Sequence, residues 1–135
     1  MTRREARELA FSLLYEATYY QPEEVPALYA REMELRPFED NAYLRAVVCG
    51  VSEKSGELDA LIEKYSNGWK VRRISRVSLA ILRLSIYEML YVEDVPFSAS
   101  INEAVELAKK YNDEKAPAFI NGVLNAVADK EGLKK

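Results

Sequence analysis

The chain of 135 residues contains no histidine and a single cysteine, Cys49. Histidine is the commonest general base near neutral pH and a frequent metal ligand, so its absence removes the usual means of acid–base catalysis and zinc binding. One cysteine can form neither an internal disulfide nor a thiolate metal site, and it is typical of a reducing compartment. No glycine-rich phosphate loop follows a strand, because no strand pattern is evident. We therefore predict a protein that is not an enzyme and that has no metal or cofactor.

An excess of positive charge is also missing, since 19 basic residues stand against 22 acidic ones and the net charge is −3. This excludes a protein that coats nucleic acid through bulk charge, so any such binding needs a local basic patch. Arg83 and Glu88 interrupt the most apolar stretch, residues 77–92, so no segment reaches the ~18 apolar residues of a membrane span. No cleavable apolar leader follows Met1. We expect a soluble cytoplasmic protein with no membrane segment.

Helical periodicity is present in every long segment, which predicts an all-α fold. Thr2 and Glu5 form a capping box for a first helix over roughly Arg3–Tyr19, whose apolar residues recur at intervals of three and four. Asn67-Gly68 marks the best boundary between two halves. A shorter second helix should end near Leu35, before Arg36-Pro37. A third helix should begin at a cap on Asp40 and kink or split at Ser55-Gly56. The remaining helices should span about Ser75–Tyr91, Ser100–Tyr111 and Pro117–Asp129.

Several local signals in the second half are specific. The segment Ser75–Tyr91 is apolar on nearly every face, which indicates a central helix surrounded by others. Ser100-Ile101-Asn102-Glu103 has the pattern of a capping box that begins the next helix, and Pro117 suits a first helical turn. Gly122 lies within an apolar helical run, where glycine costs about 1 kcal/mol relative to alanine. We therefore expect another segment to approach its backbone closely.

Two groups of basic residues are candidates for contact with nucleic acid. Arg3, Arg4 and Arg7 lie within two helical turns and could reach a phosphate backbone together, although a solvated helix end is the alternative. Residues 64–87 contain no acidic side chain and include six basic ones, namely Lys64, Lys70, Arg72, Arg73, Arg76 and Arg83. Arg72, Arg73 and Arg76 either neutralise acidic helices elsewhere or contact RNA.

Arg83 differs from the other basic residues because it lies in the middle of the most apolar helix. An unpaired charge there would cost several kcal/mol, so a carboxylate must meet it. We predict Glu88 or Glu103 as this partner and interpret Arg83 as structural.

Aromatic residues supply the remaining candidates. Phe119 follows Lys115 at the start of the last helix, where a ring can stack on a splayed base while the cation binds phosphate; core packing is the alternative. Tyr15 and Tyr19, with Tyr20 beside them, suit a protein interface, and packing against the acidic helix explains them nearly as well. Trp69 and Cys49 are interpreted as packing residues.

The block of residues 94–127, DVPFSASINEAVELAKKYNDEKAPAFINGVLNAV, with Leu82-Arg83-Leu84 and Tyr87-Glu88 before it, resembles the NusB family of bacterial transcription antitermination proteins. The resemblance covers most of the chain. It implies one compact domain, 1–135, of about seven helices in two packed halves of about 1–68 and 69–135. It also implies binding to boxA, a short single-stranded RNA element, together with NusE, a protein that is also found in the small ribosomal subunit. The resulting RNA polymerase antitermination complex would act notably in ribosomal RNA transcription.

The resemblance also suggests roles for particular residues. The expected RNA-binding residues are Arg3, Arg4, Arg7, Arg76, Lys115 and Phe119, and the expected NusE-binding residues are Tyr15, Tyr19 and Ser78. Two positions depart from the family pattern. Ala118 stands where members usually have a basic residue, and Asn125 stands where many have Asp. We expect these departures to affect RNA affinity or preference.

Two other functions fit the same pattern of helices. One is an RNA-guiding module related to the amino-terminal domain of ribosomal RNA cytosine methyltransferases, which would need a following cofactor-binding domain that this length does not provide. The other is a homodimeric helical protein without a nucleic-acid role, whose tyrosines form the self-interface. Measured RNA binding distinguishes the homodimer from the other two.

Overall fold

The computed structural model describes residues 1–35 and 41–133, and within these residues it contains seven α-helices and no strand. This confirms the predicted all-α class and the number of helices. In chain order, with two short 3₁₀ turns labelled η, the elements are α1 (Arg3–Ala17), η1 (Pro22–Glu24), α2 (Val25–Leu35), α3 (Ala42–Glu53), α4 (Ser55–Tyr65), η2 (Val71–Arg73), α5 (Arg76–Tyr91), α6 (Phe97–Tyr111) and α7 (Ala116–Lys130).

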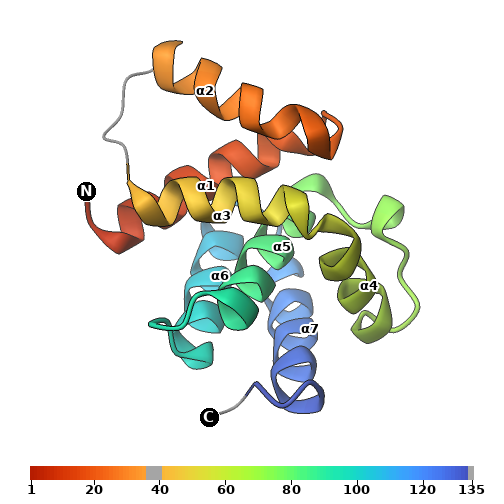
Figure 1. The fold of residues 1–135 in the computed structure, drawn as a ribbon. Coiled ribbons are helices and arrows are strands. Elements are labelled where there is room, and N and C mark those ends of the chain that lie inside the picture. The colour runs from red at the N-terminus through yellow and green to blue at the C-terminus, as the bar shows by residue number, and fades with distance from the viewer. Residues whose placement is uncertain (36–40, 134–135) are drawn as a thin grey trace.

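Helix α5 is the centre of the molecule, as its apolar faces predicted. It packs against α1, α3, α4, α6 and α7, and its buried side chains include Ile81, Leu82, Leu84 and Ile86. Helices α1 and α3 cross one side of it, with α2 lying over them, while α6 and α7 lie on the other side (Figure 1). Helix α4 contacts both α5 and α7, so helices of the first and second halves share one core. The division into two halves stays a prediction.

Most helix starts follow the local signals in the sequence. The Thr2 hydroxyl accepts a hydrogen bond from the Glu5 amide at 3.1 Å, and the Glu5 carboxylate accepts one from the Thr2 amide at 2.8 Å, which confirms the first capping box. Asn41 caps α3 by accepting from the Leu44 amide at 3.1 Å. The predicted cap Asp40 and the break at Arg36-Pro37 lie outside the described residues. The chain divides at Lys54 into α3 and α4, next to the expected interruption, and Pro117 lies in the first turn of α7.

The capping box predicted at Ser100 is wrong. Helix α6 begins three residues earlier, at Phe97, because Pro96 supplies the extended backbone that precedes its first turn. Ser100 is buried inside the helix, and its hydroxyl donates to Glu88 rather than capping a helix end. The hydrogen-bond partner of the Ser100 hydroxyl therefore belongs to α5 and not to the first turn of α6.

The close backbone approach predicted at Gly122 is also wrong. Gly122 is exposed, and a Cβ at this position would meet nothing within 4 Å. The glycine that permits a close approach is Gly50 in α3, where a Cβ would collide with the ring of Tyr87 in α5. Trp69 is not a core residue either, since 53% of its surface is exposed. None of the described helices is both long and apolar enough to cross a membrane.

Candidate nucleic-acid interface

Arg7 is the centre of a buried polar network between α1, α3, α5 and α6. Its Nε donates to the two carboxylate oxygens of Glu88 at 3.1 and 3.0 Å, and its Nη2 donates to Glu88 Oε2 at 2.8 Å. Arg7 is only 6% exposed and Glu88 is completely buried. Such a buried pair is stable only when the remaining hydrogen-bonding groups are also satisfied.

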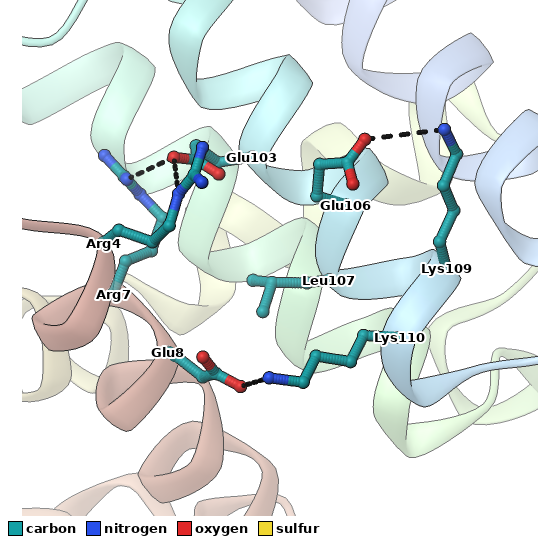
Figure 2. Close-up of a pocket in the computed structure, with 8 residues that line it drawn as sticks. All are labelled: Arg4, Arg7, Glu8, Glu103, Glu106, Leu107, Lys109 and Lys110. Carbon is teal, nitrogen blue, oxygen red and sulfur yellow. Dashed lines mark hydrogen bonds and ion pairs between the residues drawn. The ribbon is translucent and has the colours of Figure 1, made fainter.

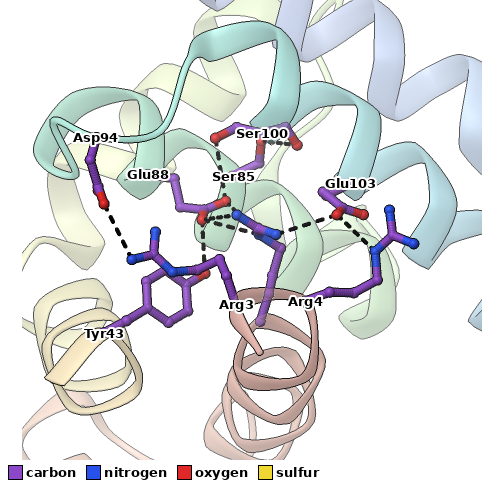
Figure 3. A network of polar contacts seen from close by, with 9 residues as sticks. Arg3, Arg4, Tyr43, Ser85, Glu88, Asp94, Ser100 and Glu103 are labelled. Carbon is purple, nitrogen blue, oxygen red and sulfur yellow. Dashed lines mark hydrogen bonds and ion pairs between the residues drawn. The ribbon is translucent and has the colours of Figure 1, made fainter. Parts of the chain in front are cut away.

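Other helices complete the coordination of Glu88 (Figure 3). The Tyr43 hydroxyl in α3 donates to Glu88 Oε2 at 2.8 Å, and the Ser100 hydroxyl in α6 donates to Oε1 at 3.3 Å. Burial, together with the negative charge of Glu88, raises the pKa of Tyr43 well above its usual value. The tyrosine therefore remains a neutral donor. We call Arg7, Tyr43, Glu88, Ser100 and Glu103 the Arg7 clasp.

The three arginines at the start of α1 have different environments. Arg4 Nε donates to Glu103 Oε1 at 3.0 Å, but its side chain remains 76% exposed. Arg3 lies 3.4 Å from Asp94 and places its guanidinium 4.4 Å from the centre of the Tyr43 ring. Arg7 also reaches Glu103, at 3.5 Å, from inside the protein. Arg7 therefore differs from Arg3 and Arg4, because its guanidinium is buried and paired with the carboxylates of Glu88 and Glu103.

A groove between α1 and α6 contains two of these arginines, Arg4 and Arg7 (Figure 2). Its volume is about 350 Å³, and it is lined by Arg4, Arg7, Glu8, Glu103, Glu106, Leu107, Lys109 and Lys110. Lys110 pairs with Glu8 at 2.6 Å, and Lys109 lies 3.5 Å from Glu106. Cations and carboxylates alternate around this groove, so its local charge is largely neutralised.

Arg83 is structural, as predicted, but its predicted partner is wrong. Its Nε and Nη2 each donate to a different carboxylate oxygen of Asp59 in α4, both at 2.8 Å. Residues 83 and 88 are five positions apart, which places them about 140° apart around the axis of a helix with 3.6 residues per turn. Glu88 therefore faces α1, where Arg7 binds it, and Arg83 faces α4.

A second hollow, which we call the Trp69–Phe119 hollow, lies where η2 meets the first turn of α7. Its volume is about 270 Å³, and its lining consists of Trp69, Arg73, Ile74, Ser75, Ser78, Asn112, Asp113, Lys115, Ala116 and Phe119. Three of these had been predicted as site residues, namely Lys115, Phe119 and Ser78. The structure brings them together, but it places none of them in the groove with Arg4 and Arg7.

The polar groups of this hollow are partly engaged with one another. The Asp113 carboxylate accepts from the amides of Lys115 and Ala116 at 2.9 and 3.0 Å and so satisfies the start of α7. Asn112 donates to the Ser78 hydroxyl at 2.8 Å. The cationic groups of Arg73 and Lys115, by contrast, have no ion-pair partner among the residues that the structure describes. Trp69 and Arg73 also line this hollow, although neither was among the predicted site residues; both lie in the acid-free stretch 64–87.

The predicted partner-binding tyrosines, Tyr15 and Tyr19, lie outside the Trp69–Phe119 hollow, at the end of α1. Arg76 donates from Nη1 to the Thr18 carbonyl at 2.5 Å and lies over the Tyr19 ring, 4.1 Å from its centre. The Tyr15 and Tyr19 hydroxyls are 3.3 Å apart, and Tyr19 is 59% exposed. Beside them is a trough of about 510 Å³ lined by Glu5, Glu8, Leu9, Phe11, Ser12, Tyr15, Val77 and Tyr111. Arg76 therefore belongs with the tyrosines rather than with Lys115.

Comparison with known proteins identifies the group to which this arrangement belongs. A model of the NusB family matches residues 4–129, nearly the whole chain. The chain belongs to the NusB family. The transcription antitermination protein NusB of Ruminiclostridium cellulolyticum is 46% identical over 129 residues, which are 95% of this chain and 89% of that protein.

Solved structures of NusB proteins have the same fold. A NusB structure from T. maritima aligns with a TM-score of 0.80 at 28% identity and covers 96% of this chain and 92% of that one. A crystal structure of the antitermination factors NusB and NusE in complex with dsRNA aligns with a TM-score of 0.80 at 29% identity and covers 95% and 96% of the two chains. Membership in the NusB family assigns this chain to the transcription antitermination factors rather than to the enzymes.

Proposed function

We propose that this protein binds single-stranded RNA of the boxA type together with NusE and so supports read-through by RNA polymerase, notably in ribosomal RNA transcription. The observation that carries the RNA-binding part is the Trp69–Phe119 hollow. It combines a half-buried aromatic ring, Phe119, with the cationic groups of Arg73 and Lys115, which no carboxylate of residues 1–35 or 41–133 engages. Rings that stack on bases beside cations that meet phosphates are the common features of single-strand binding.

The first-turn arginines extend this proposal. Arg3 and Arg4 are exposed and could exchange their carboxylate partners, Asp94 and Glu103, for phosphate oxygens. Exposed ion pairs are worth little, so this exchange costs little. Arg7 contributes indirectly, because its pairing with Glu88 and Glu103 holds α1 against α5 and α6.

The surface for NusE is proposed at the end of α1, where Tyr15, Tyr19 and Arg76 adjoin the apolar trough. The crystal structure of NusB and NusE with dsRNA shows that a relative assembles with that partner. Two weak RNA binders held side by side gain effective concentration for the same RNA. The function is then assembly, and this chain makes or breaks no bond.

Titration of labelled RNA tests the proposal. A boxA-type oligomer should bind more tightly than a scrambled one, and NusE should increase the difference. The combined change Lys115→Ala and Phe119→Ala should weaken binding to the boxA-type RNA. The control is Lys54→Ala, which removes an exposed cation that lies 5.4 Å from the Tyr91 ring, at the end of α5 opposite the hollow. Equal affinity for the two oligomers would exclude sequence-specific recognition. Self-association without RNA binding would favour the homodimer instead.

A further inference from the structure

Trp69 is the only tryptophan of the chain, and its side chain is exposed to solvent rather than buried. Its backbone is held by a short turn in which the Trp69 amide donates to the Ser66 carbonyl at 3.3 Å and the Ser66 hydroxyl donates to the Trp69 carbonyl at 2.9 Å. Its indole makes no hydrogen bond within the described part of the chain. A buried tryptophan usually donates its indole N–H to a hydrogen-bond partner. Trp69 is exposed and lacks such a partner among the described residues, so packing in the core does not explain its position.

The turn before Trp69 makes this display possible. Asn67 and Gly68 both have positive φ angles, 55° and 86°. Asn67 is the only non-glycine residue with a positive φ among the described residues, and this conformation is sparsely populated for such residues. The two left-handed residues follow the end of α4, and Trp69, directly after them, lines the hollow and stays exposed.

The surroundings of Trp69 restrict what the hollow can accept. Trp69 and Phe119 come from segments fifty residues apart and line the same cavity, with Arg73 and Lys115 beside them. The one carboxylate in the lining, that of Asp113, is engaged by the amides at the start of α7. Lys70, directly before η2, and Arg72, within η2, are exposed and adjoin the lining residues Trp69 and Arg73 in sequence. An occupant with a flat apolar surface and attached negative charge is therefore favoured, which describes a nucleotide.

We propose that the Trp69–Phe119 hollow is a subsite for one unpaired base of the RNA, with Trp69 as its principal stacking residue and Arg73 and Lys115 as contacts to the neighbouring phosphates. The proposal rests on the RNA-binding function proposed above and adds a specific residue and a specificity to it. A base within a duplex already stacks on its neighbours on both faces, so it cannot enter the hollow without unstacking. The subsite therefore selects single-stranded over double-stranded RNA.

Because the chain has a single tryptophan, its fluorescence reports on the subsite directly. We would titrate the full-length protein with a boxA-type single strand and follow two signals, the anisotropy of a dye on the RNA and the emission of Trp69. Stacking should quench the emission, and both signals should saturate at the same RNA concentration. The same RNA annealed to its complement should leave the emission unchanged. Anisotropy that rises without any change in Trp69 emission would overturn the subsite while leaving RNA binding intact.

Variants separate stacking from a structural role. Trp69→Ala should lower the affinity for the single strand by roughly 5- to 150-fold, which corresponds to the typical loss of one stacked base on alanine substitution. Trp69→Phe keeps a flat ring and should stay within about threefold of the parent protein. Tyr91→Ala removes a similarly exposed ring at the opposite end of α5 and should have no effect. Equal affinities for Trp69→Ala and the parent protein would exclude the role of Trp69, and absence of RNA binding by the parent protein would remove the proposed function itself.

Discussion

The Arg7 clasp and the Trp69–Phe119 hollow both combine arginine with aromatic rings, yet they do opposite things. In the clasp, the buried carboxylate of Glu88 pairs with Arg7 and accepts a hydrogen bond from the Tyr43 hydroxyl, so these buried polar groups are satisfied inside the protein. In the hollow, Arg73 and Lys115 face solvent beside Trp69, and the only carboxylate is occupied by backbone amides. Burial and the presence of a carboxylate therefore decide whether an arginine stabilises the fold or remains available to a ligand.

The largest effect is expected at the clasp. Arg7→Ala leaves the buried carboxylate of Glu88 without its cation, and breaking a buried pair in this way costs about 3–5 kcal/mol of unfolding free energy. Urea unfolding followed by circular dichroism measures the loss. Arg73→Ala is the matched control, because it removes an exposed arginine and should leave the midpoint unchanged. Similar midpoints for the two variants would abolish the distinction between the regions.

A second test compares packing beside the two regions. Gly50→Ala should destabilise the protein by about 1–3 kcal/mol, because the new methyl group overlaps the Tyr87 ring and forces it to move. Gly122→Ala, on the exposed side of α7 near the hollow, should instead stabilise by up to about 1 kcal/mol, since alanine favours the helix. Thermal unfolding of both variants checks the opposite signs. Two changes of the same sign would show that the contact of Gly50 with Tyr87 does not limit this position.

A pH titration tests the buried tyrosine of the clasp. The folded protein raises the pKa of Tyr43 above the unfolded value of about 10, so the stability that depends on neutral Tyr43 is complete below pH ~10 and falls as the pH rises further. One additional bound proton corresponds to about 1.4 kcal/mol per pH unit. Tyr43→Phe should reduce the alkaline slope of the unfolding free energy by this amount. An unchanged slope in urea unfolding between pH 9 and 11.5 would place the titration elsewhere.

Substitutions of the cationic residues of the hollow should weaken RNA binding but change the unfolding free energy of the protein little. Lys115→Ala and Arg73→Ala should each weaken single-strand binding several-fold and flatten its dependence on log salt by about 0.7 per lost phosphate contact. Their urea midpoints should match that of the parent protein. Filter binding at several salt concentrations measures the slope. If the slope is retained in both variants, these cations do not meet phosphate.

The smallest effect on stability is expected for Arg4→Ala. The Arg4 side chain is exposed, and Glu103 keeps Arg7 as a second cation at 3.5 Å, so loss of the Arg4–Glu103 ion pair should not be detectable in unfolding experiments. The same change should reduce the salt slope of RNA binding, because Arg4 is free to move to a phosphate. A destabilisation comparable to that of Arg7→Ala would mean that Arg4 also belongs to the clasp.

The helices could be predicted because their signals are local. The capping box of Thr2 and Glu5, the apolar faces of α5 and Pro117 in the first turn of α7 each act within one or two turns of the chain. The errors at Ser100 and Gly122 have a common cause. The residue type and its neighbours in sequence suggested a local role in each case, but the actual role depends on which side chains of another helix lie against the residue. Ser100 serves the carboxylate of α5, and the glycine that a neighbouring ring requires is Gly50 instead.

The sequence by itself determined the all-α class, the central position of α5, membership in the NusB family and the types of residue from which a site could be built. Only the tertiary structure decided which arginine is buried, that Arg83 pairs with Asp59, and that Trp69 joins Phe119 and Lys115 at one hollow. The physical reason is the separation in sequence over which each kind of interaction acts. Helix formation depends on residues three and four positions apart, so it can be predicted from short stretches of sequence. Ion pairs and binding sites depend on how packed helices are rotated relative to one another, and no short stretch of sequence specifies that rotation.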